Sequence, residues 1–131
     1  MKKILIVFFT ILSLFCKGQS LQSLDTVKAP AGYENIFIRH LYSDSLVSSF
    51  VIFIKNEVKV HRHVYHTEHI YILDGEGEMK IGDKKIRIQK GNIIFVPKNT
   101  IHSLKVISQT PIKALSVQTP FFDGKDRVFV E

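Results

Sequence analysis

Short β-forming stretches, each closed by turn-forming residues, fill most of this chain and limit what it can fold into. They are rich in β-branched and aromatic residues, and Gly, Pro, Asn, Asp or Ser separates them. The predicted strands are 34–42, 46–55, 57–64, 68–74, 78–81, 84–89, 93–96, 101–108 and 112–118. No helical pattern longer than one turn interrupts them. The sequence therefore predicts a single all-β domain, a sandwich or barrel, within its 131 residues.

Several segments carry more specific predictions. Residues 75–77 predict a tight turn, and Gly82-Asp83 predicts a hairpin between the strands on either side of it. The wholly apolar stretch 93–96 indicates a strand that is covered on both faces. The tail, 119–131, mixes Pro and Gly with large apolar residues. We expect this tail to pack as an arm on the barrel or on a second subunit.

The N-terminus has the layout of a secretory signal peptide. Lys2 and Lys3 precede an apolar run over 4–15, and small residues stand at Cys16 and Gly18. The run is shorter than the roughly 20 residues that a membrane span needs. We expect residues 1–18 to be a leader cleaved after Gly18, and the protein to be periplasmic or secreted. The alternative for the run itself is a short buried strand or helix.

A lipoprotein anchored through Cys16 is the minor alternative to a soluble exported form. The bulky Phe15 stands where a lipobox requires a small residue, which disfavours this alternative. Cleavage after Gly18 leaves a mature chain without cysteine, so that chain needs no disulfide in an oxidising compartment.

The charge of the mature chain is mildly positive. The leader carries Lys2, Lys3 and Lys17 and no acid, so its removal reduces the formal net charge from +6 to +3. The remaining basic residues are scattered along the predicted strands instead of forming a patch. This pattern does not indicate a nucleic-acid partner.

Three histidines and one glutamate form the candidate metal site. His61 and His63 are two residues apart, so on a strand both imidazoles point to the same face. Glu68 follows after a short turn, and His102 follows the turn signal at 97–100. Three imidazoles and one carboxylate suit a divalent transition metal: iron, manganese, nickel, copper or zinc.

These residues also resemble the two signature motifs of the cupin superfamily. The positions in register with those motifs are His61, His63, Glu68, Gly75, Gly91, Pro97 and His102. Lys55, Asn99 and Val106 replace two glycines and one asparagine of the family pattern. The departures affect turn and packing positions, and Asn99 is among the few non-glycine residues that accept left-handed backbone geometry.

The resemblance implies a cupin-type double-stranded β-helix, or jelly-roll barrel, over residues 33–131. Residues 19–32 would then be an N-terminal tether or edge segment. It also implies that His61, His63, Glu68 and His102 are the metal ligands, and that a small-molecule ligand or substrate binds beside them. Small cupins of this kind commonly form homodimers through sheet edges, so we expect a homodimer and no membrane span.

Other polar residues near the motif have weaker claims to the site. His66 lies in the turn between the ligand-bearing strands and is a candidate for contact with a ligand or substrate. His69 follows Glu68, so strand alternation directs it to the opposite face, and Tyr71 shares its parity. Tyr65 is a candidate hydrogen-bonding group of the pocket. His40 is expected to be an ordinary solvated side chain.

Two function classes remain open at this stage. One is a metal-dependent cupin enzyme acting on a small organic molecule, such as a dioxygenase or an isomerase, with the metal as Lewis acid, template or redox centre. The other is a non-catalytic module that binds a metal or a small ligand. The sequence offers no competing Ser-His-Asp arrangement or phosphate-binding glycine loop. The fold alone does not choose a reaction, because one fold hosts many functions.

Overall fold

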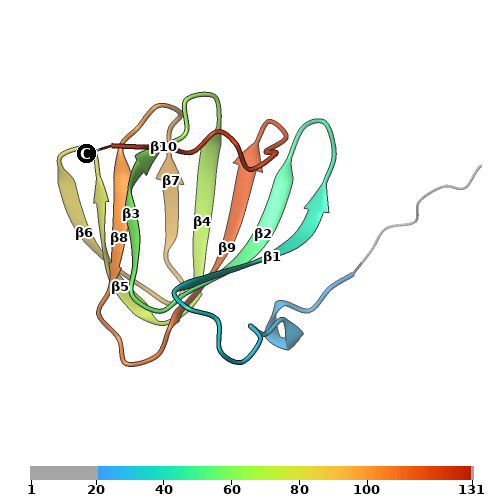
Figure 1. The fold of residues 1–131 in the computed structure, drawn as a ribbon, viewed down its shortest axis with the longest axis vertical. Coiled ribbons are helices and arrows are strands. Elements are labelled where there is room, and N and C mark those ends of the chain that lie inside the picture. The colour runs from blue at the N-terminus through green and yellow to red at the C-terminus, as the bar shows by residue number, and fades with distance from the viewer. Residues whose placement is uncertain (1–20, 131) are drawn as a thin grey trace, which may run out of the picture.

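Two antiparallel five-stranded sheets face each other in the computed structural model, which describes residues 21–130 (Figure 1). The first sheet has the order β1 (Ile36–Ser43), β2 (Ser48–Ile54), β9 (Ile112–Thr119), β4 (Thr67–Asp74) and β7 (Ile93–Val96). The second has the order β10 (Val128–Phe129), β3 (Glu57–Arg62), β8 (His102–Val106), β5 (Glu76–Ile81) and β6 (Lys84–Gln89). The predicted all-β domain is confirmed, and its crossed connections are those of a jelly roll.

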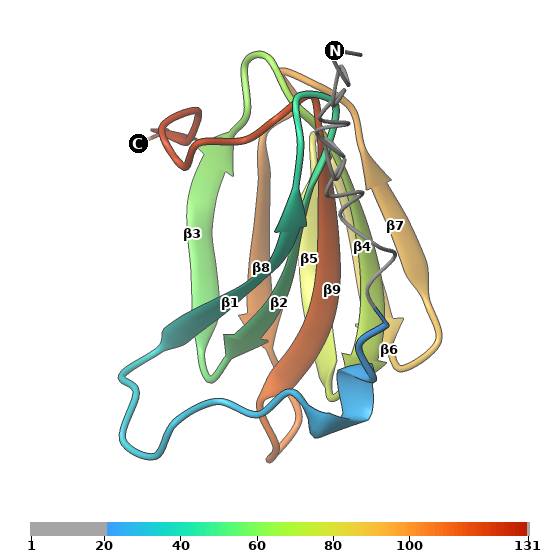
Figure 2. The same ribbon diagram turned by 90° about the vertical axis from the view of Figure 1, so that its right-hand side faces the viewer.

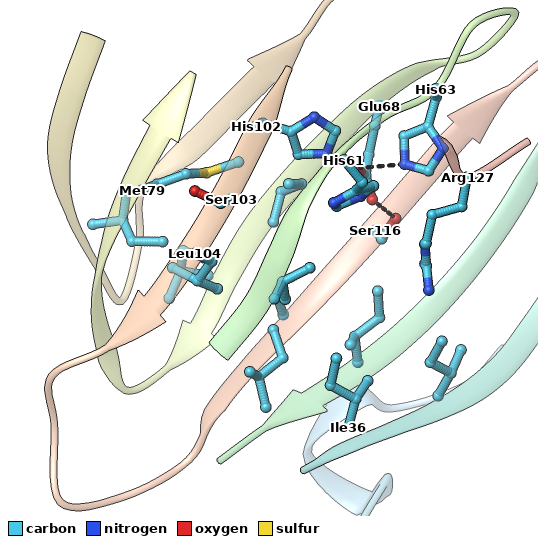
Figure 3. Close-up of a pocket in the computed structure, with 18 residues that line it drawn as sticks. Ile36, His61, His63, Glu68, Met79, His102, Ser103, Leu104, Ser116 and Arg127 are labelled. Carbon is cyan, nitrogen blue, oxygen red and sulfur yellow. Dashed lines mark hydrogen bonds and ion pairs between the residues drawn. The ribbon is translucent and has the colours of Figure 1, made fainter. Parts of the chain in front are cut away.

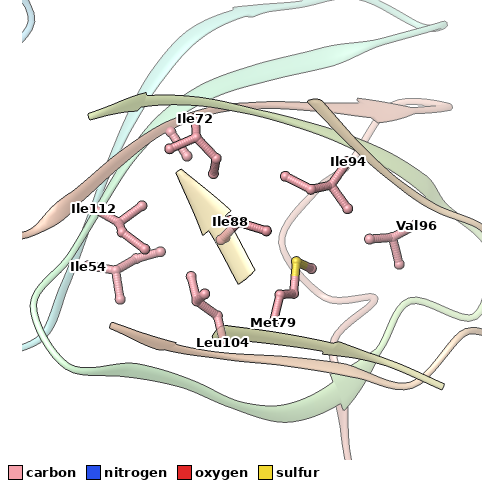
Figure 4. Close-up of a cluster of buried hydrophobic side chains, with 9 residues drawn as sticks. Ile54, Ile72, Met79, Ile88, Ile94, Val96, Leu104 and Ile112 are labelled. Atoms are coloured by element: carbon pink, nitrogen blue, oxygen red, sulfur yellow. The ribbon is translucent and has the colours of Figure 1, made fainter. Parts of the chain in front are cut away.

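The hydrophobic core lies between the two sheets (Figure 4). Strand alternation explains its composition, because every second residue of a strand points inward. On β9 the buried positions alternate, with Ile112 and Ala114 followed by Ser116 and Gln118. The buried core residues are Ile54, Ile72, Met79, Ile88, Ile94, Val96, Leu104, Ile112 and Ala114. The change from apolar to polar along β9 marks the end of the core and the start of the candidate site.

Turn residues adopt the backbone geometry that their types allow. Asn99, which stands where the cupin motif has a glycine, has φ of 61°, and its N–H donates to the His63 carbonyl at 2.5 Å. Gly75 has φ of 82°, and a Cβ there would lie 2.8 Å from the Pro111 carbonyl oxygen. The prediction that Asn99 forms a left-handed turn is confirmed. The turn at Gly75 follows β4 and the turn at Asn99 precedes β8, and these two strands carry Glu68 and His102.

Two details of the strand prediction are wrong. Strand β7 is covered on one face only: Ile93 is 68% exposed and Phe95 is 53% exposed. The reason is that residues 21–130 form two facing sheets, so the side chains of β7 that point away from the core have no further layer over them. The predicted turn at 75–77 is also too long, because Glu76 already belongs to β5 and pairs with Gln89.

The segment that precedes β1 crosses the end of the barrel opposite the C-terminal arm (Figure 2). A short 3₁₀ helix, η1 (Leu24–Thr26), is followed by Val27, which is buried. Lys113 Nζ donates to the Leu24 carbonyl at 2.6 Å, which fixes the segment to β9. The predicted leader and the junction to residue 20 lie outside the described residues. Among residues 21–130, no helix is long and apolar enough to cross a membrane.

Residues 120–130, the C-terminal arm, return over the open end of the barrel. Phe122 is buried, and Phe122 N–H donates to Ser48 Oγ at 3.0 Å. Further along, β10 pairs with β3, with Val128 opposite Arg62. The arm therefore packs on its own barrel (Figure 1), and Phe122 lies against the ring of His63.

Candidate metal centre

The four predicted ligand residues meet at one end of the barrel. His61 at the end of β3 is the register partner of His102 at the start of β8. His63 follows β3, and Glu68 lies on β4 of the opposite sheet. All four side chains are buried, and the ligand nitrogens of the three histidines lie within 4.8 Å of one another. Figure 3 shows them converging from both sheets.

Each of the three imidazoles is oriented by a backbone carbonyl. His61 Nδ1 donates to Lys59 O at 2.8 Å, His102 Nδ1 donates to Thr100 O at 2.9 Å, and His63 Nδ1 donates to Asp126 O. A carbonyl oxygen only accepts, so each Nδ1 carries the proton. In a neutral ring this leaves the Nε2 lone pair free to bind a metal, an arrangement typical of metal-ligating histidines.

Glu68 completes the cluster from the facing sheet. Its Oε2 lies 3.7 Å from His63 Nε2 and 3.7 Å from His102 Nε2. Its Oε1 accepts hydrogen bonds from Ser116 Oγ and, at 3.3 Å, from Gln118 Nε2. Burial alone would raise the pKa of the Glu68 carboxyl. The neighbouring His102 and the Ser116 hydrogen bond outweigh that effect and lower the pKa, so the group is a carboxylate at neutral pH.

Two of the histidines, His61 and His63, are held in their neutral form by burial. Burial is the main reason that the pKa of His61 falls to about 4, and the nearby His102 adds to the shift. Burial also lowers the pKa of His63, against the opposing effect of its hydrogen bond to the Asp126 carbonyl. Neutral imidazoles at physiological pH are the form that binds metals.

A cavity opens from the cluster into the barrel (Figure 3). Its volume is about 60 Å³, which exceeds the space that a single ordered water needs. Most of its wall is apolar and comes from both sheets. The residues that line it include Ile38, Ile52, Ile54, Ser103, Ser116 and Arg127. A ligand bound at the cluster would therefore place its remaining atoms against aliphatic side chains.

Comparison with known proteins identifies the family. The family model described as the cupin domain matches residues 50–118. An uncharacterised protein of Aquifex aeolicus is 32% identical over 98 residues, which cover 75% of this chain and 80% of that protein. This chain belongs to the cupin family.

Two further proteins that resemble this cupin differ in length, one being much longer than this chain and the other of similar length. It is 40% identical to the quercetin 2,3-dioxygenase of Bacillus subtilis over 48 residues, which cover 37% of this chain and 14% of the dioxygenase. An uncharacterised Klebsiella pneumoniae protein with a double-stranded β-helix domain superposes with a TM-score of 0.71 at 18% identity, covering 87% of this chain and 99% of the other. The second similarity shows the fold alone.

The donor set of this cupin suits a divalent metal ion. The ligand nitrogens of the three histidines lie within 4.8 Å of one another, and Glu68 Oε2 lies 3.7 Å from those of His63 and His102. His102 Nε2 is buried and has no hydrogen-bond partner in the described residues. A buried acceptor without a donor is unfavourable, and a cation bound at the cluster would satisfy it. Such an ion would be held by His61, His63, Glu68 and His102 and would supply Lewis-acid or redox chemistry.

The other predicted residues lie outside the cluster. His66 is buried but links to the C-terminal arm, with Nδ1 2.5 Å from Asp126 Oδ2 and Nε2 2.9 Å from Phe121 O. His69 is exposed on the outer face and packs on Phe95 with ring centroids 5.0 Å apart, as alternation predicted. Tyr65 is 73% exposed, so it does not line the cavity. 

Tyr71 and His40 lie on the surface. Tyr71 is 40% exposed, and His40 Nε2 lies 2.7 Å from Ser43 Oγ on an exposed part of β1. Neither contributes to the cavity, which is the placement expected for both residues.

Four residues of the site were not predicted from the sequence. Ser116 and Gln118 orient Glu68, Asp126 orients His63, and Arg127 lines the cavity. A signal existed for the first two, since polar residues at the inward positions of an otherwise apolar alternating strand require a partner. Asp126 and Arg127 stand in an irregular tail, where no periodic pattern assigns a direction to a side chain.

Proposed function

We propose that this protein is an exported, metal-binding cupin that acts on a small organic molecule, with His61, His63, Glu68 and His102 as metal ligands. The convergence of four buried acceptor atoms at the mouth of an apolar cavity carries the proposal. Four protein ligands leave room in an octahedral sphere for two further ligands. A substrate could occupy those positions while its carbon skeleton rests on the isoleucines of the cavity.

This chain's own residues would position the reacting molecule. The carbonyls of Lys59, Thr100 and Asp126 hold the imidazoles in one tautomer, and Ser116 holds the carboxylate. The mostly apolar wall of the cavity lowers the local dielectric, which strengthens the electrostatic interactions inside it. The relative quercetin 2,3-dioxygenase is a dioxygenase by name, which makes dioxygenase chemistry the first class to test. Isomerase chemistry, for which the metal would act as a Lewis acid, is the second.

Metal content is the decisive measurement. Residues 19–131, purified without chelator or metal-affinity resin, should contain about one transition-metal ion per chain by mass spectrometry. A His61→Ala/His102→Ala variant should contain none, while a His40→Ala/His69→Ala variant should match the wild type. No metal in the wild type, and no stabilisation by added iron, manganese, nickel, copper or zinc, would reject the metal centre.

A non-catalytic ligand-binding module is the second candidate, and the size of the cavity favours it. A volume of about 60 Å³ is small beside the roughly 300–1,000 Å³ of typical ligand pockets. Small acids, phenols and sugars should be screened with the iron- and manganese-loaded protein for both turnover and thermal shift. A ligand that raises the melting temperature without being converted supports the module. Turnover supports the enzyme.

Export and self-association complete the proposal. The leader 1–18 motivates export, and N-terminal sequencing of the mature protein should begin at Gln19. A lipidated N-terminus at Cys16 would support the anchored alternative instead. We also propose that the protein forms a homodimer.

A further inference from the structure

Arg127 is the only cationic side chain that lines the cavity among the residues the structure describes. The other lining residues are the candidate metal ligands, two serines and aliphatic side chains or methionine. In Figure 3 its side chain extends from the arm past His63 toward the end of the cavity where Ile36 lies. Arg127 is half-buried, and an arginine that lines an apolar cavity without a charged partner is unusual, because burial of an unpaired guanidinium is costly.

The guanidinium of Arg127 has no anionic partner within the described residues. None of the ion pairs in that part of the chain involves it, and its buried Nε has no hydrogen-bond partner. Glu68, the one carboxylate that lines the same cavity, faces His63 and His102 and is bonded by Ser116. Two acids on the same arm have other partners: Asp123 pairs with Lys125 Nζ at 3.3 Å, and the Asp126 carboxylate is bonded by Val64, Tyr65 and His66.

The position of Arg127 is fixed from both sides. The preceding Asp126 carboxylate accepts from Val64 N at 2.9 Å and Tyr65 N at 2.8 Å. After it, β10 pairs with β3, and Val130 N–H donates to Val60 O at 3.1 Å. A residue held between two such anchors has a defined orientation, so its entry into the cavity follows from the fold and not from a loose end of chain.

Arg127 also stands where a ligand would enter. Together with Ile38 and Ile52 it lines both the inner cavity and an outer groove between β1, β2 and the C-terminal arm. A divalent ion and Arg127 together carry more positive charge than Glu68 balances. A small anion that reaches both would neutralise the excess, and arginine binds carboxylates through two parallel hydrogen bonds.

We propose that Arg127 binds the carboxylate of a small organic acid whose apolar part occupies the isoleucine-lined cavity beside the metal centre. The proposal rests on the proposed metal-binding function and names its substrate or ligand class as short aliphatic carboxylates. The cavity of about 60 Å³ limits such an acid to a few carbon atoms. Neutral analogues of the same shape would lack the interaction that distinguishes this site.

Calorimetric titration of the zinc-loaded, full-length mature protein in chloride-free buffer tests the proposal. The probes are acetate, propionate and isobutyrate, each paired with its neutral amide. At least one acid should bind about tenfold or more tightly than its amide, and Arg127→Gln should remove that difference while the zinc content stays unchanged. Arg39→Gln, a change at an exposed arginine of β1, should bind the acids as the wild type does.

Two results overturn the assignment of Arg127. One is equal binding of acids and amides, or no binding of any acid below about 10 mM. The other is an Arg127→Gln variant that binds acids as tightly as the wild type does. If the wild type takes up no zinc, the same titration is carried out on the metal-free protein, so that the carboxylate site is tested independently of the metal centre. Arg127-dependent acid binding then supports the carboxylate site, and its absence overturns it.

Discussion

At the scale of single residues, the orientation of Glu68 depends on Ser116. Ser116 Oγ donates to Oε1 in a fully buried environment, which leaves Oε2 directed at the imidazoles. Ser116→Ala removes the donor without a change in backbone. Loss of such a supporting hydrogen bond should weaken metal binding by about 10- to 100-fold, measured by competition with a chromophoric chelator.

Ser103 offers a matched control for this prediction. It lines the same cavity but has no hydrogen bond to Glu68. Ser103→Ala should leave metal affinity within about threefold of the wild type, because it removes a hydroxyl that does not touch the ligand set. Equal losses in Ser103→Ala and Ser116→Ala would show that general packing, and not the orientation of Glu68, controls affinity.

The lowered histidine pKa values predict how the metal-free protein responds to acid. His61 has a pKa of about 4 in the folded state, against roughly 6.5 in an unfolded chain. Between these values the unfolded state binds more protons, so the free energy of unfolding falls as the pH falls from about 6.5 to about 4. The lowered pKa of His63 acts in the same direction.

Urea unfolding of the metal-free protein at several pH values measures this effect. The free energy of unfolding should decline through that window for the wild type and decline less for His61→Gln, which removes one titrating group. The His40→Gln variant changes an exposed histidine and should follow the wild-type curve. A flat wild-type profile would contradict the assignment of His61 as a buried, neutral imidazole.

Much of the candidate site could be predicted at this scale, and the limit has a physical cause. The spacing of His61, His63 and Glu68 already implies convergence, because alternation on strands fixes the direction of side chains. The fourth residue, His102, depended on a motif, since local spacing does not reveal which distant strand pairs with β3. Neither strand alternation nor the family motif could predict the position of Arg127, because Asp126 and β10 on either side of it fix the direction of its side chain.

At the scale of elements, the C-terminal arm is tied to the barrel through Asp126. Its carboxylate accepts from Val64 and Tyr65 and contacts His66, while its carbonyl accepts from His63. Burial opposes ionisation, but these hydrogen bonds lower the pKa of Asp126 to about 2. The same residue therefore both closes the arm and orients a candidate ligand.

Asp126→Ala should release the arm. Three donors lose their acceptor, so the free energy of unfolding should fall by roughly 2–3 kcal/mol. Trypsin should cleave faster after Lys125 and Arg127, and metal affinity should fall as His63 loses its orientation. Asp123→Ala changes an exposed neighbour on the same arm and should leave the free energy of unfolding, the rate of cleavage and the metal affinity near wild type. Unchanged proteolysis in Asp126→Ala would show that Phe122 and β10 suffice to hold the arm.

The strands themselves were predictable to within a few residues, and the exceptions share a cause. Alternation and turn chemistry located β1 to β9, and the left-handed Asn99 followed from its side chain. The two-residue strand β10 and the edge position of β7 could not be predicted in this way. Both depend on which strand lies next to which, and sheet order is set by tertiary packing, which local sequence does not encode.

At the scale of the whole molecule, the outer face of β4 and β7 is the surface we expect to form the homodimer. Tyr71, Ile93 and Phe95 are 40%, 68% and 53% exposed. Tyr71 and Ile93 are register partners, as are His69 and Phe95, so these side chains form one continuous patch. β7 is also a free sheet edge. A second copy can cover an apolar patch and pair its own β7 with this edge about a twofold axis, which closes the assembly.

Sedimentation analysis at micromolar concentration checks this interface. The wild type should sediment as a dimer, and Ile93→Lys/Phe95→Lys should convert it to a monomer, since two charges would be buried without partners. Leu46→Lys, at an equally exposed apolar residue in the β1–β2 turn, should remain dimeric. A dimer that persists in the double variant would place the interface elsewhere. A wild-type monomer would show that the β7 edge does not pair with a second copy. It would also show that the candidate metal site is complete within one chain.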